Sequence, residues 1–171
     1  MNIKNNIGVT LTILVVTIVV MLILFGVTFS TATDLLKNSQ KNKMKTMLYM
    51  VQSRAEILLD DYLFDNDGKD LSTISDSDIQ KALGGTYMRS LTDIQSVGFG
   101  TTFTELPSKD TIIYCSWNES VLKSQGIDTK NLANGDTIVI QYNVATDEVD
   151  VASKKGFSDG DGNAIHALSD F

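Results

Sequence analysis

The sequence predicts an α+β protein in which one long N-terminal helix packs on a small antiparallel β-sheet. Three observations lead to this prediction. Residues 9–64 contain no proline and a single glycine, Gly26, so one helix can run through all of them. The second half of that helix has one apolar stripe, which needs a cover. From residue 97 onward, apolar and polar residues alternate, which is the period of a strand with one buried face.

The predicted helix begins in an apolar run. From Ile7 to Phe29 the chain has 23 consecutive residues without a charge, behind a polar leader whose only charged side chain is Lys4. At ~1.5 Å per residue this run is about 34 Å long, and a bilayer core is ~30 Å thick. An ordinary secretory signal has an apolar region of only ~7–15 residues. We therefore expect a leader at residues 1–8 and a membrane-spanning helix at residues 9–29.

Residues 30–64 are expected to continue the helix with an amphipathic pattern. Its apolar residues recur at spacings of four and three, which places them on one helical face. That face is the candidate surface for packing on the head, and it consists of Met44, Leu48, Val51, Ala55, Leu58 and Tyr62. Asn66 and Gly68 favour a left-handed stop, so the helix should end near Asp65.

A globular α+β head is expected over residues 65–156. Ser75 followed by Asp78 predicts a short capped helix that ends at Leu83. Alternating residues predict about four antiparallel strands, with a short helix near residues 119–124 and a hairpin turn at residues 143–147. The strand residues are Val97, Phe99, Thr101 and Phe103, then Ile113, Cys115 and Trp117, then Ile138, Ile140 and Tyr142, then Val149 and Val151. The Gly/Asp-rich end, residues 157–171, is expected to be a loosely held tail.

Charge is unevenly divided along the chain. Residues 1–59 carry six basic and two acidic side chains, a net charge of +4, whereas residues 60–171 carry eight basic and nineteen acidic ones, a net charge of −11. Nucleic-acid binding needs clustered basic groups that replace the counterions of phosphate. The acidic head therefore argues against a nucleic-acid partner.

Acidic residues gather around Gly68 and before Gly162 in a way that suggests calcium. Alignment of either segment with an EF-hand loop, however, puts apolar residues at the first and twelfth positions, where the loop needs ligands. The acidic residues concerned are Asp65, Asp67, Asp70, Asp159 and Asp161. We therefore predict solvated turns at both places, and no metal or cofactor.

No residue of the chain suggests catalysis. Cys115 is the only cysteine and alternates with apolar neighbours, so we interpret it as a buried apolar group, and we place Trp117 in the core. The helical spacing of Met44, Met47 and Met50 favours core packing over a binding surface. His166, the only histidine, is expected at the surface. Because no phosphate loop, catalytic triad or ligand cluster accompanies these residues, we predict that the protein is not an enzyme.

The N-terminal residues resemble a known processing motif. Residues 4–16, Lys-Asn-Asn-Ile-Gly-Val-Thr-Leu-Thr-Ile-Leu-Val-Val, are similar to the N-terminus of type IV pilins and type II secretion pseudopilins, and the run that follows is similar to pilin-like proteins of Gram-positive bacteria. In that family a prepilin peptidase cuts after the glycine that ends the leader. The resemblance implies cleavage between Gly8 and Val9, methylation of the Val9 amine, a pilin-like fold, and a head outside the cytoplasmic membrane.

One position departs from the family pattern. The fifth residue after the implied cut is Ile13, where most pilins have a glutamate that pairs with the N-terminal amine of a neighbouring subunit. Because a buried charge persists only when it is partnered, its absence changes how the subunit can be placed in a filament. Some minor pilins that start or cap a filament lack this glutamate. We therefore hypothesise a minor or tip subunit, whose partners are the membrane, the prepilin peptidase, other pilin subunits and the assembly machinery.

Three alternatives stay open. The chain can be a single-pass membrane-anchored extracellular binding domain that never assembles. The small residues Ser30-Thr31-Ala32 have the spacing of a signal-peptidase site, and a cut after Ala32 would release a secreted domain. Four lysines between residues 37 and 45 follow the expected span, and the positive-inside rule applied to them alone puts the head in the cytosol. The cleavage motif implies the opposite orientation.

Overall fold

The structure, a computed structural model, describes residues 4–99, 103–130, 132–158 and 164–170, without the side chains of residues 4–12 and 27–34. The chain divides into two compact units, residues 1–39 and residues 40–171. Helix α1 (Lys4–Asp65) contributes to both of them. Among the described side chains, no helical stretch is long and apolar enough to cross a membrane. The expected span, residues 9–29, lies partly outside those side chains.

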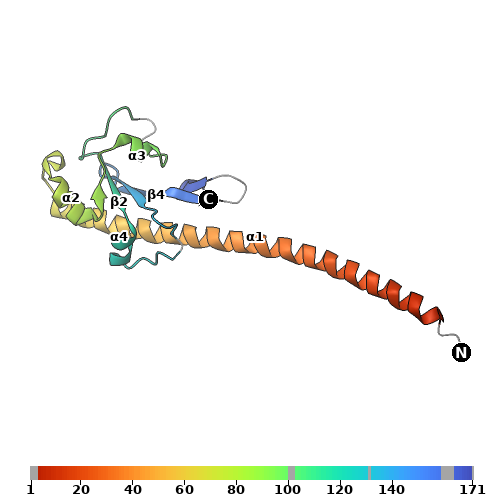
Figure 1. Cartoon of the computed structure of the whole chain (residues 1–171). Coiled ribbons are helices and arrows are strands. Elements are labelled where there is room, and N and C mark those ends of the chain that lie inside the picture. Colours follow the sequence, from red (N-terminus) through yellow and green to blue (C-terminus); the bar gives the residue numbers. More distant parts are fainter. Residues whose placement is uncertain (1–3, 100–102, 131, 159–163, 171) are drawn as a thin grey trace. The chain divides into compact units, whose positions relative to one another are not determined.

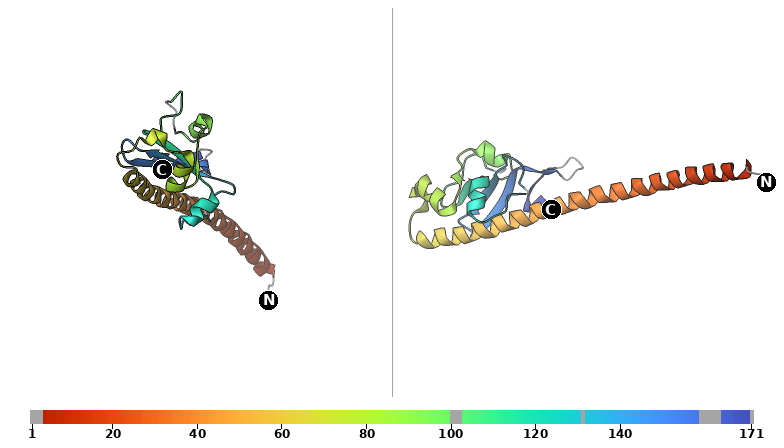
Figure 2. Two further views of the ribbon diagram at one scale, coloured as in Figure 1. Left: turned by 90° about the vertical axis from the view of Figure 1, so that its left-hand side faces the viewer. Right: turned by 60° about the horizontal axis from the view of Figure 1, so that its bottom comes forward.

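The second unit is an α+β head, as the sequence predicts. Its central element is a five-stranded antiparallel sheet in the order β1-β2-β3-β4-β5, so each strand pairs with its neighbour in sequence (Figures 1 and 2). The strands are β1 (Thr86–Tyr87), β2 (Ile112–Trp117), β3 (Ile138–Asn143), β4 (Glu148–Ser158) and β5 (Ala164–Ala167). The short helices are η1 (Leu71–Thr73), α2 (Asp76–Leu83), α3 (Leu91–Gln95), α4 (Glu119–Ser124) and η2 (Leu168–Asp170).

Within the head, one face of the sheet packs on residues 40–65 of α1. The inward side chains of this helix are 0–3% exposed: Met44, Met47, Leu48, Val51, Ala55, Leu59 and Tyr62. They meet alternate residues of the strands, among them Cys115, Ile140 and Val151, which lie side by side in register on β2, β3 and β4. The predicted helix stripe is therefore confirmed except at Leu58. That side chain is half-buried, and the next residue, Leu59, takes the central place.

The other face of the sheet is covered by the segment around α3, so the sheet is the middle of three layers (Figures 1 and 2). Val139 of β3 and Ala152 of β4 are adjacent in register and pack with Val97. Tyr114 of β2 points to the same side, where its ring centroid lies 6.3 Å from that of Phe99. Because both faces are covered, β2 and β3 carry apolar residues at most positions.

Local signals fix the ends of the helices. The Ser75 hydroxyl accepts from the Asp78 N–H at 3.2 Å and donates to the Asp78 carboxylate at 2.6 Å, which confirms the predicted cap of α2. Helix α4 has the predicted bounds, and the Asn118 side chain caps it. Gly68, with φ +72°, follows the end of α1.

Two predictions about strands are wrong. Residues 97–99 form a turn after α3, because Ser90 caps that helix and carries the chain into it; Thr101 lies outside the described residues. Val97 and Phe99 still pack on the sheet. The alternation of apolar and polar residues there indicates buried side chains but not a strand. The end of the chain is not a loosely held tail: β4 continues to Ser158, and β5 pairs with it through Phe157↔Ile165.

A buried acidic side chain holds the beginning of β3 to β4. Asp136 is 3% exposed, and its carboxylate accepts hydrogen bonds from the Ser153 hydroxyl at 2.5 Å, the Lys155 N–H at 2.9 Å and the Thr137 N–H at 2.7 Å. Ser153 also accepts from the Gly156 N–H at 2.9 Å, beside the irregular register between β4 and β5. A buried carboxylate is tolerated here because several donors converge on it.

Candidate assembly surface

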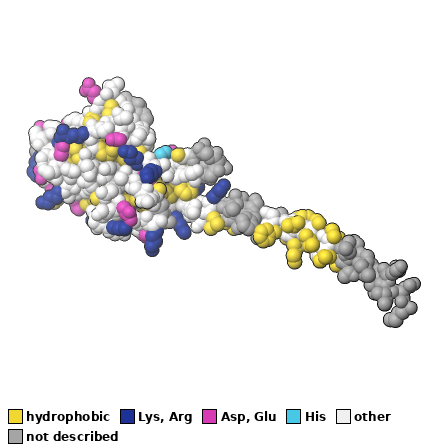
Figure 3. Space-filling model, viewed as in Figure 1, with side chains coloured by type: hydrophobic (Ala, Val, Ile, Leu, Met, Phe, Trp, Pro, Cys, Tyr) yellow, Lys and Arg dark blue, Asp and Glu magenta, His cyan; other side chains and the backbone are white. Residues whose placement is uncertain are grey.

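The most unusual surface of the molecule is the apolar segment of α1 at residues 13–26. Its large apolar side chains are 48–72% exposed, and they occupy every position from 13 to 25 except Thr17, so they cover every side of the helix. Figure 3 shows hydrophobic side chains gathered on the side of this segment that faces the viewer. The Thr17 hydroxyl donates to the Leu14 carbonyl at 2.8 Å, so this polar group is satisfied within the helix. Such a surface suits an apolar environment.

The residues implied in processing and register lie at or before this segment. Gly8 and Val9 belong to α1, but their side chains are outside the described part of the chain. Ile13 is 58% exposed and brings no charge to the apolar surface. The helix continues through Gly26, where an added Cβ would meet nothing within 4 Å.

Two polar side chains at the border of the packed helix face connect α1 to the head. Gln52 Nε2 donates to the Val149 carbonyl of β4 at 2.8 Å, and Arg54 Nε donates to Gln125 Oε1 behind α4 at 2.8 Å. The sequence places both residues off the apolar stripe and gives no sign of these bonds, because their partners lie 97 and 71 positions away.

The outer face of α1 in the head also carries apolar residues. Met50, Ile57 and Phe64 are 46%, 49% and 84% exposed, and they recur every seven residues, which places them on one helical face. We call these three residues the outer stripe. The expectation of core packing is therefore confirmed for Met44 and Met47 and wrong for Met50.

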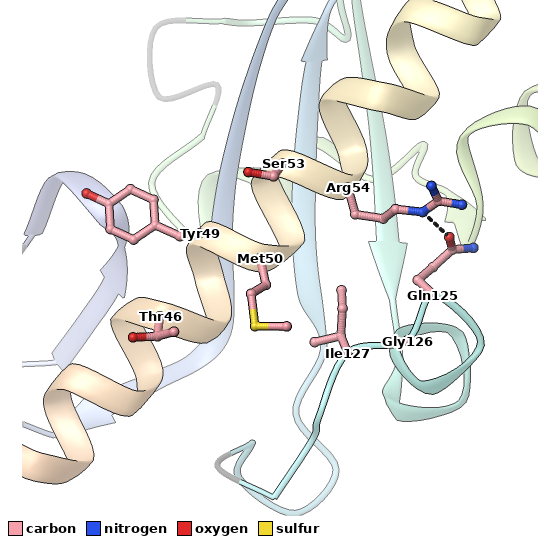
Figure 4. A pocket seen from close by; sticks show the side chains of 8 residues that line it. All are labelled: Thr46, Tyr49, Met50, Ser53, Arg54, Gln125, Gly126 and Ile127. Atoms are coloured by element: carbon pink, nitrogen blue, oxygen red, sulfur yellow. Dashed lines mark hydrogen bonds between the residues drawn. The ribbon is translucent and has the colours of Figure 1, made fainter.

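A groove of about 410 Å³ lies beside the outer stripe, between α1 and the segment that follows α4. It is lined by Thr46, Tyr49, Met50, Ser53, Arg54, Gln125, Gly126 and Ile127. Figure 4 shows Met50 and Ile127 facing one another across it, with the Arg54–Gln125 hydrogen bond at one end. Since its walls are mainly apolar, the groove suits an apolar side chain better than a charged ligand.

The other residues considered for chemistry have structural roles. Cys115 and Trp117 are fully buried, as predicted, and burial raises the pKa of the Cys115 thiol to about 12, so it is not a thiolate nucleophile at neutral pH. The Trp117 indole donates to the Leu83 carbonyl at 3.2 Å. His166 is half-buried rather than freely exposed, with its Nδ1 2.9 Å from the Ser153 carbonyl.

The acidic residues near Gly68 do not converge on a common point. Asp70 caps η1, accepting from the Ser72 N–H at 3.1 Å and from the Ser72 hydroxyl at 2.6 Å. Within the described ranges, no three His, Cys, Asp or Glu side chains gather as metal ligands would. Asp159 and Asp161 lie outside those ranges.

One charged cluster joins α2 to the loop before β2. Asp76 binds Lys109 Nζ at 2.7 Å and also contacts Arg89, and the hydrogen bond from Lys109 lowers the pKa of the Asp76 carboxyl. Lys109 also donates to the Ile74 carbonyl at 2.8 Å and lies 5.5 Å from the centroid of the Tyr87 ring. Every charge in this cluster has a partner, so its role is to position the loop.

Comparison with known protein families, curated proteins and solved structures finds no match to this chain.

Proposed function

We propose that this protein is a pilin-like structural subunit. A prepilin peptidase removes residues 1–8, and residues 9–29 hold the subunit in the cytoplasmic membrane with the head outside. The subunit then enters a type IV pilus or a type II secretion pseudopilus as a minor or tip component. It is not an enzyme in this proposal, and it needs no cofactor.

The observation that carries the proposal is the exposed apolar surface of residues 13–26. A patch of this extent is costly in water, because each side chain that leaves water contributes on the order of 1 kcal/mol or more. Both lipid and a bundle of similar helices would remove this surface from water. A helix that is apolar on every side can occupy either environment without a change in conformation.

The packing of the head supports the same proposal. The inward side chains of α1 between Met44 and Tyr62 are covered by the sheet of their own chain, so the head can be a folded body outside the membrane. This division gives one helix two tasks: its second part completes a domain, and its first part anchors that domain and offers a surface to other subunits.

Ile13 supports a minor or tip role. A tip subunit has no neighbour above it whose amine requires a carboxylate, so an apolar residue at this position is acceptable there. The same residue also favours the second candidate function, a single-pass anchored binding domain that stays in the membrane, since such a protein has no register to set.

The test is the mature N-terminus of the protein isolated from its own host, measured by mass spectrometry. The proposal expects Val9 at the N-terminus, with a methylated amine. Gly8→Asp should retain the leader and prevent surface display. Gly26→Ala, a change at the other glycine of the same helix, is the matched control and should be processed normally.

The other outcomes distinguish the alternatives. An intact leader supports the anchored binding domain, and an N-terminus at Thr33 supports secretion after Ala32. If Val9 is exposed by cleavage but the protein is never recovered in sheared surface fibres, processing stands and assembly is rejected.

A further inference from the structure

The part of α1 in the head, with the two residues that follow it, divides along the sequence into two charged bands. Residues 41–54 carry bases and no acids: Lys41, Lys43, Lys45 and Arg54. Residues 55–67 carry acids and no bases: Glu56, Asp60, Asp61, Asp65 and Asp67. We call them the basic band and the acidic band. All five acidic side chains and Lys43 are exposed, whereas Lys41, Lys45 and Arg54 are half-buried.

The outer stripe runs through both bands. Met50 lies within the basic band and beside the groove, whereas Ile57 and Phe64 lie within the acidic band. Arg54 follows Met50 by four residues, and Asp61 follows Ile57 by four, so both charges flank the stripe on the same face. Phe64 is the most exposed large apolar residue described in the head, at 84%.

We propose that a second copy of this chain, parallel to the first and shifted along α1, docks its acidic band and Phe64 onto the basic band and groove of the first. Opposite charges then face one another, and Phe64 enters the groove between Tyr49, Met50 and Ile127. A shift of about 14 to 18 residues, or about 21–27 Å, brings the bands together. This inference rests on the proposed function, because membrane-held subunits all point the same way.

The contact has a consequence for assembly. It joins two different patches of the same chain, so each docked copy still offers its own basic band and groove to the next. A repeated contact between unlike patches gives an open helical array when the rotation does not close a ring. The contact therefore belongs to the minor role in the proposed function and not to the tip role, because a tip subunit has no neighbour above it. An antiparallel pair would bury both bands at once and stop at a dimer, but membrane-held copies cannot adopt it.

The test is site-directed cross-linking of the full chain extracted in mild detergent. One tagged version carries Met50→Cys and the other carries Phe64→Cys. Cys115 is fully buried with a raised thiol pKa, so it needs no replacement. A short bismaleimide should join Met50→Cys to Phe64→Cys, and neither version to itself. Thr92→Cys, an exposed position of α3 on the other side of the sheet and outside both bands, should not couple to Met50→Cys.

A charge swap tests the electrostatic part. Lys43→Glu with Arg54→Glu in the Met50→Cys chain should lower the mixed cross-link about tenfold. Asp60→Lys with Asp61→Lys in the Phe64→Cys chain should restore it. Lys123→Glu with Lys130→Glu makes the same change in net charge on exposed residues of the head outside α1, and should leave the yield unchanged. Emission of buried Trp117 checks that each variant is folded.

Coupling of Met50→Cys to itself would indicate copies in register and would overturn the inference, as would a charge swap that fails to restore the mixed product. The proposed function fails separately. Fibres that contain the chain cut after Gly8, without the mixed cross-link, would retain the function and reject this contact. The mixed cross-link in a chain that keeps its leader would do the reverse.

Discussion

Residues 13–26 and residues 40–65 are both stretches of α1, yet their apolar side chains differ in exposure. The first stretch is apolar on all sides, and its large side chains are about half exposed or more. The second has one apolar face at 0–3% exposure, covered by the sheet, and a charged outer face. Their helical geometry is the same, so the difference lies in the width of the apolar surface.

The comparison shows how side-chain pattern assigns an environment to each part of a helix. A stripe about one face wide can be satisfied by a partner within the chain, as the sheet satisfies Leu48 and Val51. An apolar surface that goes all round needs lipid or several neighbouring helices. Charge placed in the first stretch should therefore affect localisation, and volume removed from the second should affect folding.

The largest expected effect comes from charge in the first stretch. Val19→Arg with Leu22→Arg places two guanidinium groups in the apolar surface, and each costs about 2.5–3.5 kcal/mol at the centre of a membrane helix. The double variant should leave the membrane fraction on cell fractionation. The urea midpoint of the head, followed by emission of the single tryptophan, Trp117, should stay the same.

The matched control places the same charges outside the apolar stretch. Asn38→Arg with Asn42→Arg alters two exposed positions of α1 and should keep the protein in the membrane fraction. Membrane retention of Val19→Arg with Leu22→Arg at the wild-type level would mean that lipid is not the environment of residues 13–26.

The next effect tests the two faces of the second stretch. Leu48 is 1% exposed on the sheet side, so Leu48→Ala should lower the free energy of unfolding by about 2–5 kcal/mol. Ile57, on the outer stripe, is 49% exposed, and Ile57→Ala should change it by less than about 0.5 kcal/mol. Urea titration followed by Trp117 emission measures both. Equal losses would contradict the assignment of the inner and outer faces.

The sequence predicts those parts of the fold that depend on local signals. The N-cap at Ser75, the bounds of α4 and the alternation in β2 and β3 can all be recognised within a few residues. The inner face of α1 follows from helical period alone. Leu58 and Leu59 fit that period equally well, and only the position of the sheet decides which of them is central.

The remaining features depend on contacts between distant residues. The two-residue strand β1 exists because β2 is there to pair with it, and β5 pairs across an irregular register that no local pattern marks. The groove requires α4 to approach α1, which brings Ile127 opposite Met50. The outer stripe, by contrast, can be seen in the sequence as a seven-residue spacing. The exposure of its side chains becomes evident only when the structure shows which face of α1 packs on the sheet.

A pH titration examines the inner face of the packed stretch. Burial raises the pKa of the Cys115 thiol from 9.0 to about 12. Burial is also the main reason why the pKa of the Tyr62 hydroxyl rises from 10.0 to about 12. The folded head thus favours the protonated forms. Their stabilisation is complete below about pH 9 and is lost as pH rises toward 12, by on the order of 1 kcal/mol per pH unit.

Denaturant midpoints measured between pH 8 and pH 11 check this expectation. The Cys115→Ala variant should lose less stability than the wild type between pH 9 and pH 10, because its first titrating group is absent. A wild-type midpoint that stays constant up to pH 11 would show that these groups are not buried in the folded head.

The smallest expected effect comes from removing a tyrosine hydroxyl, which tests whether apolar contact alone stabilises the inner face of α1. Tyr62 is 1% exposed, and its hydroxyl has no hydrogen-bond partner among the described residues. The Tyr142 hydroxyl, in the same core, donates to the Leu83 carbonyl at 2.9 Å. Tyr62→Phe removes an unsatisfied buried group and should stabilise the head by about 1 kcal/mol, whereas Tyr142→Phe should destabilise it by a similar amount.

The two substitutions delete the same atom, so their difference isolates the hydrogen bond. Tyr142→Phe leaves the Leu83 carbonyl with the Trp117 indole as its donor at 3.2 Å, which limits the loss to the bond itself. Urea midpoints at neutral pH give both values. If Tyr62→Phe is the more destabilising of the two, its hydroxyl has a partner in solution, and the inner face of α1 depends on a polar contact as well as on apolar packing.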